Sequence, residues 1–141
     1  MAMRRKLRAW QGYGRARRGL ILEAACMLAL ARLAVIALPF RILAKALRRA
    51  PDVTACDPAL LAAVSQAVAT AAHNVPWNAV CLPQAIAVKA MLARRGHGSR
   101  LHLGAGTKDG KLIAHAWVTA GGAVIIGGAG MADVTQVASF G

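Results

Sequence analysis

The sequence predicts an α+β domain in which helices come first and a small antiparallel sheet follows. From residue 19 to residue 38, apolar side chains recur at intervals of three and four, which is the period of a helix, and further helical stretches separated by turns follow up to residue 95. After residue 98, short runs alternate apolar and polar side chains between glycine turns, as hairpin strands do. Helices followed by strands are the element order of an α+β fold.

The longest predicted helix covers residues 19–38. Apolar residues lie between its periodic positions, which indicates burial on most of its faces. Pro39 lacks an amide donor and ends or kinks this helix, and a short basic amphipathic helix follows at residues 42–48. The preceding residues 1–18 are basic and interrupted by glycines, which predicts a flexible or weakly helical docking arm.

Two more helices are predicted in the middle of the chain. The first covers residues 58–72 and is opened by Asp57, an aspartate cap that precedes a proline at the first helical position. The second covers residues 83–95 and ends at Gly96, a residue type common after helix ends. Cys81 therefore lies at a helix start.

Three strands are predicted, over residues 100–104, 111–119 and 123–126. Turn residues separate them, so successive strands pair in antiparallel fashion. The residues after 127 carry only weak signals.

The chain of 141 residues suits one domain. We divide it into a basic N-terminal arm with helices, residues 1–50, and a core, residues 51–141. Its 18 lysines and arginines face five acidic residues, and the resulting net charge of +13 implies an anionic partner such as nucleic acid, a membrane surface or an acidic protein. We expect no nucleic-acid partner, because no aromatic RNP strand, GXXG clamp or zinc knuckle accompanies the basic residues.

The three cysteines are odd in number and lack CxxC spacing, so we expect neither a disulfide framework nor a metal site, and a cytoplasmic, reducing location. The apolar stretch 19–40 superficially resembles a signal or anchor. Because Glu23 and Arg32 interrupt it and no cleavage site follows, we expect a buried amphipathic helix in preference to a membrane span. Membrane association is therefore a disfavoured alternative.

Cys81 has the surroundings of a nucleophile. Unpaired amides and the positive end of the helix dipole favour a thiolate at a helix start. The same amides can donate to an oxyanion, and Pro83 removes an amide only where no helical partner exists. The alternative is that Cys81 is a small hydrophobic core residue.

His115 is a polar ring between Ala114 and Ala116 in an apolar strand, so it needs a partner. A histidine satisfied within the core is the alternative to a catalytic one. The other histidines lie at a helix end, in a glycine turn and on a polar strand face, and are His73, His97 and His102. His115 is therefore the best candidate base, and we predict that it forms a cysteine-protease-type pair with Cys81.

Two segments carry a family resemblance. Cys81-Leu82-Pro83-Gln84-Ala85 with its following helix, and Ala114-His115-Ala116-Trp117-Val118, resemble the transglutaminase-like leader peptidases of lasso-peptide biosynthesis. The helical stretch that begins at Glu23-Ala24 is similar to the N-terminal part of that family, so the resemblance covers residues 18–128. It implies N-terminal helices packed on a transglutaminase- or papain-like core.

The resemblance also implies an activity and partners. The enzyme would remove the leader from a lasso precursor peptide, with Cys81 attacking and His115 as base. An ATP-dependent cyclase would then join the freed amine to an acidic side chain. No winged-helix module is visible near the N-terminus, so we expect a leader-recognition protein in trans. No cofactor is implied.

One position departs from the family pattern. The third catalytic residue is normally an aspartate about a dozen positions after the histidine, where this chain has Gly127. Asp133 is the nearest downstream candidate and Asp109 lies on the preceding turn, and either can instead be a solvated loop residue. A backbone carbonyl as orienter, or a site of two residues, is the other alternative.

A function of another class also fits the sequence. The chain can be read as a basic helical docking module for a membrane surface or an acidic protein, with a non-catalytic Cys81. The reactivity of the Cys81 thiol distinguishes the two readings.

Overall fold

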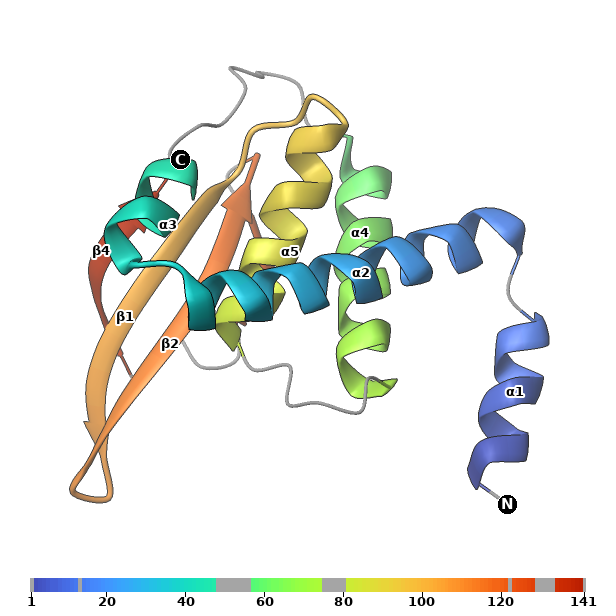
Figure 1. Cartoon of the computed structure of the whole chain (residues 1–141), viewed down its shortest axis with the longest axis horizontal. Helices are drawn as coiled ribbons and strands as arrows, with labels where there is room; N and C mark the ends of the chain where they lie inside the picture. Colours follow the sequence, from blue (N-terminus) through green and yellow to red (C-terminus); the bar gives the residue numbers. More distant parts are fainter. Residues whose placement is uncertain are drawn as a thin grey trace.

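The computed structural model describes residues 2–12, 14–47, 57–74, 81–121, 123–128 and 134–140. Within these ranges five helices precede a four-stranded antiparallel sheet (Figure 1). The predicted α+β class is thereby confirmed. The candidate Asp133 lies outside the described residues, and so does Cys56.

The basic arm contains a helix, α1 (Ala2–Gly12), so of the two predicted alternatives, flexible or weakly helical, the structure has the helical one there. Most of its residues favour helix, and the glycines that suggested flexibility fall at or beyond its end. Arg18 supplies a cap, because its Nε donates to the carbonyl of Trp10 at 3.0 Å and its Nη2 to that of Gln11 at 2.6 Å. These bonds satisfy carbonyls that a helix end leaves unpaired.

Helix α2 (Arg15–Ala37) ends before Pro39, as predicted, and α3 (Phe40–Leu47) follows. Leu38 has an extended backbone, which is the conformation favoured before proline. Helix α4 (Pro58–Asn74) begins at the predicted cap, where Asp57 Oδ1 accepts the amide of Ala59 at 3.0 Å.

Helix α5 (Cys81–Arg94) begins two residues earlier than predicted, so Cys81 is its first residue. At its end Gly96 has a φ of 75°, and the amide of His97 donates to the carbonyl of Leu92 at 2.9 Å. This left-handed residue with a backward hydrogen bond is the predicted glycine stop.

The sheet has the strand order β3-β2-β1-β4. Its strands are β1 (Arg100–Lys108), β2 (Lys111–Ala120), β3 (Ala123–Ile126) and β4 (Thr135–Phe140). The first three match predicted strands. The fourth was not predicted, because this exposed edge strand is defined by its pairing with β1 and has no apolar alternation strong enough to mark it.

One hydrophobic core joins the helices to the sheet. Helices α2, α4 and α5 pack against one another, and α5 lies against β2 (Figure 1). The largest fully buried side chains come from all of these elements and are Leu28, Val64, Val68, Val88, Met91, Leu92, Leu101 and Val118. Small alanines at the helix contacts, such as Ala24 and Ala85, are buried completely and let the helices approach closely.

Helix α2 is buried along one face only, so the prediction of burial on most faces is wrong. Its inner face carries Ile21, Ala24, Leu28 and Ala31, which belong to the core. Of the helices in the described ranges, α2 alone has the length and apolar composition needed to cross a membrane, and 22% of that stretch is buried in the fold.

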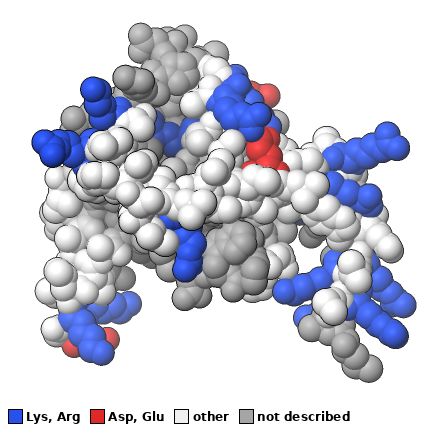
Figure 2. All heavy atoms as spheres, viewed as in Figure 1, with Lys and Arg blue, Asp and Glu red and all other residues white. Residues whose placement is uncertain are grey.

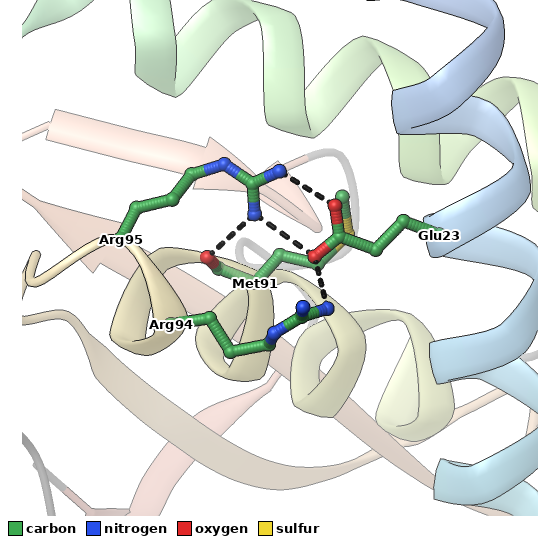
Figure 3. A network of polar contacts seen from close by, with 4 residues as sticks. All are labelled: Glu23, Met91, Arg94 and Arg95. Atoms are coloured by element: carbon green, nitrogen blue, oxygen red, sulfur yellow. Dashed lines mark hydrogen bonds and ion pairs between the residues drawn. The ribbon is translucent and has the colours of Figure 1, made fainter.

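Glu23 ties α2 to the end of α5 (Figure 3). Arg95 donates from Nη2 to Glu23 Oε2 at 2.5 Å and from Nη1 to Oε1 at 2.9 Å, while Arg94 Nη1 reaches Oε1 at 2.6 Å. The Arg95 hydrogen bond holds the pKa of Glu23 below its ordinary value, and in return the pKa of Arg95 is raised. Only 16% of the Glu23 side chain is exposed, so water screens the Arg95 pair weakly.

Lys89, another basic residue of α5, makes its hydrogen bond inside the fold. Lys89 is 4% exposed, and its Nζ donates to the carbonyl of Ser99 at 2.5 Å. Burial lowers the pKa of Lys89, and the neighbouring charge of Arg100 lowers it further. Of the basic residues between positions 89 and 100, Lys89 therefore does not contribute to the positively charged surface.

Glu23→Gln tests the contribution of this ion pair. We expect it to lower the free energy of unfolding by about 2 kcal/mol near neutral pH, because it leaves two arginines without their carboxylate. A carboxylate whose pKa is lowered in the folded state contributes stability above its unfolded pKa of about 4.5, and this contribution is lost as the pH falls through the lower folded-state pKa. The difference between the two proteins should therefore shrink below about pH 4.5 and be absent once the pH is below the folded-state pKa of Glu23. Urea unfolding measured across this pH range gives both quantities.

Asp109→Asn is the matched control, since it removes the same charge from an exposed turn residue. It should change stability by less than about 0.5 kcal/mol. An equal loss in both variants would contradict a specific role for Glu23.

Candidate active site

Cys81 opens α5 and is half-buried against the hydrophobic core. As the first residue of the helix, it lies where backbone amides have no partner within the helix and where the helix dipole is positive. It is a free thiol. Within the described ranges, no three His, Cys, Asp or Glu side chains lie close enough to hold a metal ion.

His115 lies in the middle of β2 and is half-buried. Side chains alternate along a strand, so His115 shares one face of the sheet with Trp117 and Thr119. The rings of His115 and Trp117 stack with centroids 6.2 Å apart and planes inclined by 20°. The strand is therefore regular here, and Trp117 supports one side of the imidazole.

The backbone of Gly127 orients the His115 ring. Nε2 of His115 donates to the carbonyl oxygen of Gly127 at 2.5 Å. A carbonyl oxygen can only accept, so Nε2 carries a proton in this bond and the neutral ring has its lone pair on Nδ1. Gly127 follows His115 by 12 positions. A backbone carbonyl thus lies where the resemblance to leader peptidases predicts an aspartate.

The local backbone explains why this position is glycine. Gly127 has a φ of 82°, in the left-handed region that glycine adopts without strain. A Cβ atom there would lie 2.5 Å from the carbonyl oxygen of Ala116 and 3.0 Å from Cα of Trp117. Any side chain at this position would displace the strand next to it, and with it the carbonyl that holds His115.

Sequence reasoning ranked His102 as a weak candidate and missed its place beside this site. Its ring stacks on Trp117 with centroids 5.3 Å apart and an angle of 9°, so Trp117 lies between two imidazoles. Nδ1 of His102 bonds Gln136 Oε1 at 2.9 Å and Nε2 bonds Thr119 Oγ1 at 2.8 Å. Both ring nitrogens are occupied, which suits a positioning residue. The hairpin register, which pairs His102 with Trp117, was the one available signal.

The fold packs the helix that begins with Cys81 against the strand that carries His115, but it does not join the two side chains. Helix α5 packs against β2, runs in the same direction, and begins level with the middle of that strand (Figure 1). Ala116 and Val118 enter the core on the α5 side, whereas His115 belongs to the alternate set. In the described part of the chain, no hydrogen bond links Cys81 Sγ with His115. Their catalytic pairing therefore stays a prediction.

Asp109 is not placed to orient His115. It lies in the exposed turn that joins β1 to β2, with a φ of 53°. His115 is four residues along β2 from the first residue of that strand, a separation of about 13 Å at the rise of an extended chain. Asp133 lies outside the described residues, so its role stays a prediction.

A comparison with protein families identifies the domain. The sequence model of the transglutaminase-like superfamily matches residues 24–139, from the middle of α2 to the end of β4. The chain belongs to the transglutaminase-like superfamily. This superfamily includes cysteine peptidases and typically carries cysteine-dependent enzymes. No curated protein and no solved structure matches the chain.

Gly127→Ala tests whether this backbone holds His115. We expect a loss of about 1–3 kcal/mol in the free energy of unfolding, because the substitution strains a left-handed residue and crowds β2. The Nε2 proton of His115 should also lose its hydrogen-bonded signal in nitrogen-15 NMR of the imidazole, since the carbonyl moves away.

Gly128→Ala is the control, because among the described residues a Cβ there meets only Val124 Cγ1, at 3.4 Å, and its backbone is not left-handed. It should change neither stability nor the imidazole spectrum appreciably. If Gly127→Ala also leaves the spectrum unchanged, the carbonyl is not the orienting group.

Proposed function

We propose that the protein is a cysteine peptidase that removes the leader peptide from a ribosomally synthesised lasso-peptide precursor. The observation that carries this proposal is the His115 ring, which Gly127 holds with Nδ1 free to act as a base, in a superfamily domain whose α5 begins with a cysteine. The likeness of residues 81–85 and 114–118 to leader peptidases supplies the substrate class.

In the first step, Nδ1 of His115 accepts the proton of the Cys81 thiol, and Sγ attacks the carbonyl carbon at the end of the leader. The new C–S bond forms while the carbonyl π electrons move onto oxygen. Backbone amides in the first turn of α5 can donate to that oxyanion. The imidazolium then protonates the leaving amine, the C–N bond breaks, and the core peptide departs with a free N-terminus.

In the second step, His115 removes a proton from water, and the hydroxide attacks the thioester between Cys81 and the leader. The C–S bond breaks, the thiolate is regenerated and takes back its proton, and the leader departs as a carboxylic acid. The freed amine of the core peptide is the group that a partner ATP-dependent cyclase requires for macrolactam formation. Leader removal therefore precedes ring closure.

The proposal includes partners that act in trans. A small leader-recognition protein would present the precursor, and the cyclase would receive the product. The positive charge of the chain favours encounter with an acidic leader or an acidic recognition protein. No cofactor is needed, because a thiol, an imidazole and water complete both steps.

Alkylation kinetics test whether Cys81 is activated. With iodoacetamide near neutral pH, Cys81 should react at least about tenfold faster than Cys26, although Cys26 is exposed and Cys81 is half-buried. His115→Ala should slow Cys81 alone, which peptide mass spectrometry of the labelled sites can measure. Equal rates at the two cysteines would favour the docking module with a non-catalytic Cys81.

Leader cleavage tests the function itself. The protein is incubated with a lasso precursor and recognition protein encoded beside it, and the products are measured by mass. Cys81→Ala and His115→Ala should each reduce the cleavage rate by about a thousandfold or more, because nucleophile and base act as a unit. Cleavage by both variants at the native rate would refute the mechanism.

Asp133→Asn in the same assay identifies the orienting group. If the Gly127 carbonyl orients His115, this variant should cleave within about threefold of the native rate, as should the control Asp109→Asn. Replacing the aspartate of a true triad costs about ten-thousandfold in rate. A loss of that size would assign the role to Asp133.

A further inference from the structure

The outer side of α2 exposes a continuous apolar stripe, which we call the outer apolar face. Leu22, Leu30, Leu33 and Ile36 of α2 are 57%, 59%, 61% and 71% exposed. Cys26 lies among them and is exposed as well. Beyond the end of α2, Ile42 of α3 is 53% exposed. Scattered single apolar residues are normal on a surface, but a continuous stripe marks an interaction site.

This face is opposite to the one that packs in the fold. Residues 22, 26, 30 and 33 follow helical spacing and lie on one side of α2, while Ile21, Ala24, Leu28 and Ala31 lie on the other. In Figures 1 and 2, α2 crosses in front of α4 and α5 and turns a mostly uncharged surface toward the viewer. No helix or strand of the described ranges lies over it in these views.

Basic side chains gather at both ends of the outer apolar face. Arg4, Arg5, Lys6 and Arg8 of α1 are exposed beside the start of α2, whose own Arg15 is exposed too. Arg41 and Lys45 of α3 are exposed at the far end. Figure 2 shows Lys and Arg side chains crowded over α1 and the beginning of α2. Glu23 is the only acidic residue before residue 50, and two arginines already neutralise it.

We propose that the outer apolar face binds the surface of a bilayer rich in anionic phospholipids, with α2 lying in the plane of the interface. A helix of 23 residues, about 35 Å long, with aliphatic residues along one side, cations at its start and further cations on α3 beyond its end, complements a flat anionic surface. Protein interfaces are instead enriched in aromatic residues and methionine, whereas this face carries mainly leucine and isoleucine.

The fold favours a helix on the membrane surface over one that crosses it. Spanning would require α2 to leave α4 and α5 and to expose the core residues Ala24 and Leu28. It would also bring Glu23 into hydrocarbon after breaking its bonds to Arg94 and Arg95. Surface binding keeps these contacts and buries only the side chains that the fold leaves exposed.

Vesicle binding of the full chain tests the proposal. The protein should sediment with vesicles of phosphatidylglycerol and phosphatidylcholine, bind vesicles of pure phosphatidylcholine at least about tenfold more weakly, and lose affinity as salt is raised. Cys26 also offers a direct probe of the face. In a Cys56→Ser/Cys81→Ala background, an NBD dye on Cys26 should gain fluorescence and shift to the blue when anionic vesicles are added.

The dye has a matched control. In a background without native cysteines, Leu112→Cys carries the same dye on β2, at a site that is 80% exposed in the native chain. Its emission should not change with vesicles. The dye measurement needs no change to the face beyond the label, so it stands even if substitutions in α2 impair folding.

Substitutions complete the test. Leu30→Gln/Ile36→Gln should lower vesicle affinity by about tenfold or more, because two apolar contacts are lost. Leu112→Gln/Val137→Gln, which changes exposed residues of the sheet, should keep it within about twofold. Circular dichroism confirms that both variants fold.

Absence of binding to anionic vesicles would overturn the proposal. An affinity for these vesicles that stays unchanged when Leu30 and Ile36 are replaced would also overturn it. A dimer that these two substitutions dissociate would assign the face to a second copy of the chain.

Discussion

The packing of α5 against β2 is the constraint on which the rest of the structure depends. Helix α5 lies between the sheet and the helices α2 and α4, and most of its side chains are buried. Its first residue is Cys81, and the strand beneath it carries His115. Because one helix is held from both sides, its start cannot shift without disturbing the whole core. The core therefore determines where the thiol lies relative to the sheet.

Polar contacts hold the second half of α5, which ends near the surface of the protein. Glu23 joins it to α2 through Arg94 and Arg95, and Lys89 joins it to the residue before β1. Glu23 and Lys89 are largely buried, and buried charged groups are retained only when each has a partner. In this chain those partners come from separate elements, so the same bonds that satisfy the charges also set the position of α5.

In the proposed mechanism, the backbone carbonyl of Gly127 takes the place of an aspartate beside His115. It holds His115 in the tautomer with a free Nδ1, as a carboxylate would, but it brings no full negative charge. It therefore stabilises the imidazolium less than an aspartate does, while still fixing the direction of the ring. Stacking between His102 and His115 through Trp117 adds rigidity from the other side. The direction of the His115 ring is thus set by the Gly127 carbonyl and by stacking on Trp117.

Local chemistry was sufficient to predict several elements from the sequence. The proline after α2, the Asp57 cap of α4 and the glycine after α5 act within a few residues, so their positions could be inferred directly. Cys81 and His115 could be named as candidates for the same reason, since helix starts and apolar strands are local features. The basic composition likewise indicated an anionic partner.

Only the tertiary structure decided the features that join distant segments. The edge strand β4, the internal use of Lys89 and Arg95, and the bond from His115 to Gly127 each depend on a partner far along the chain. The exposure of one side of α2 was equally hidden, because an apolar helix has the same sequence pattern whether one face or all faces are covered. Periodicity records which residues share a face, and packing decides which faces meet.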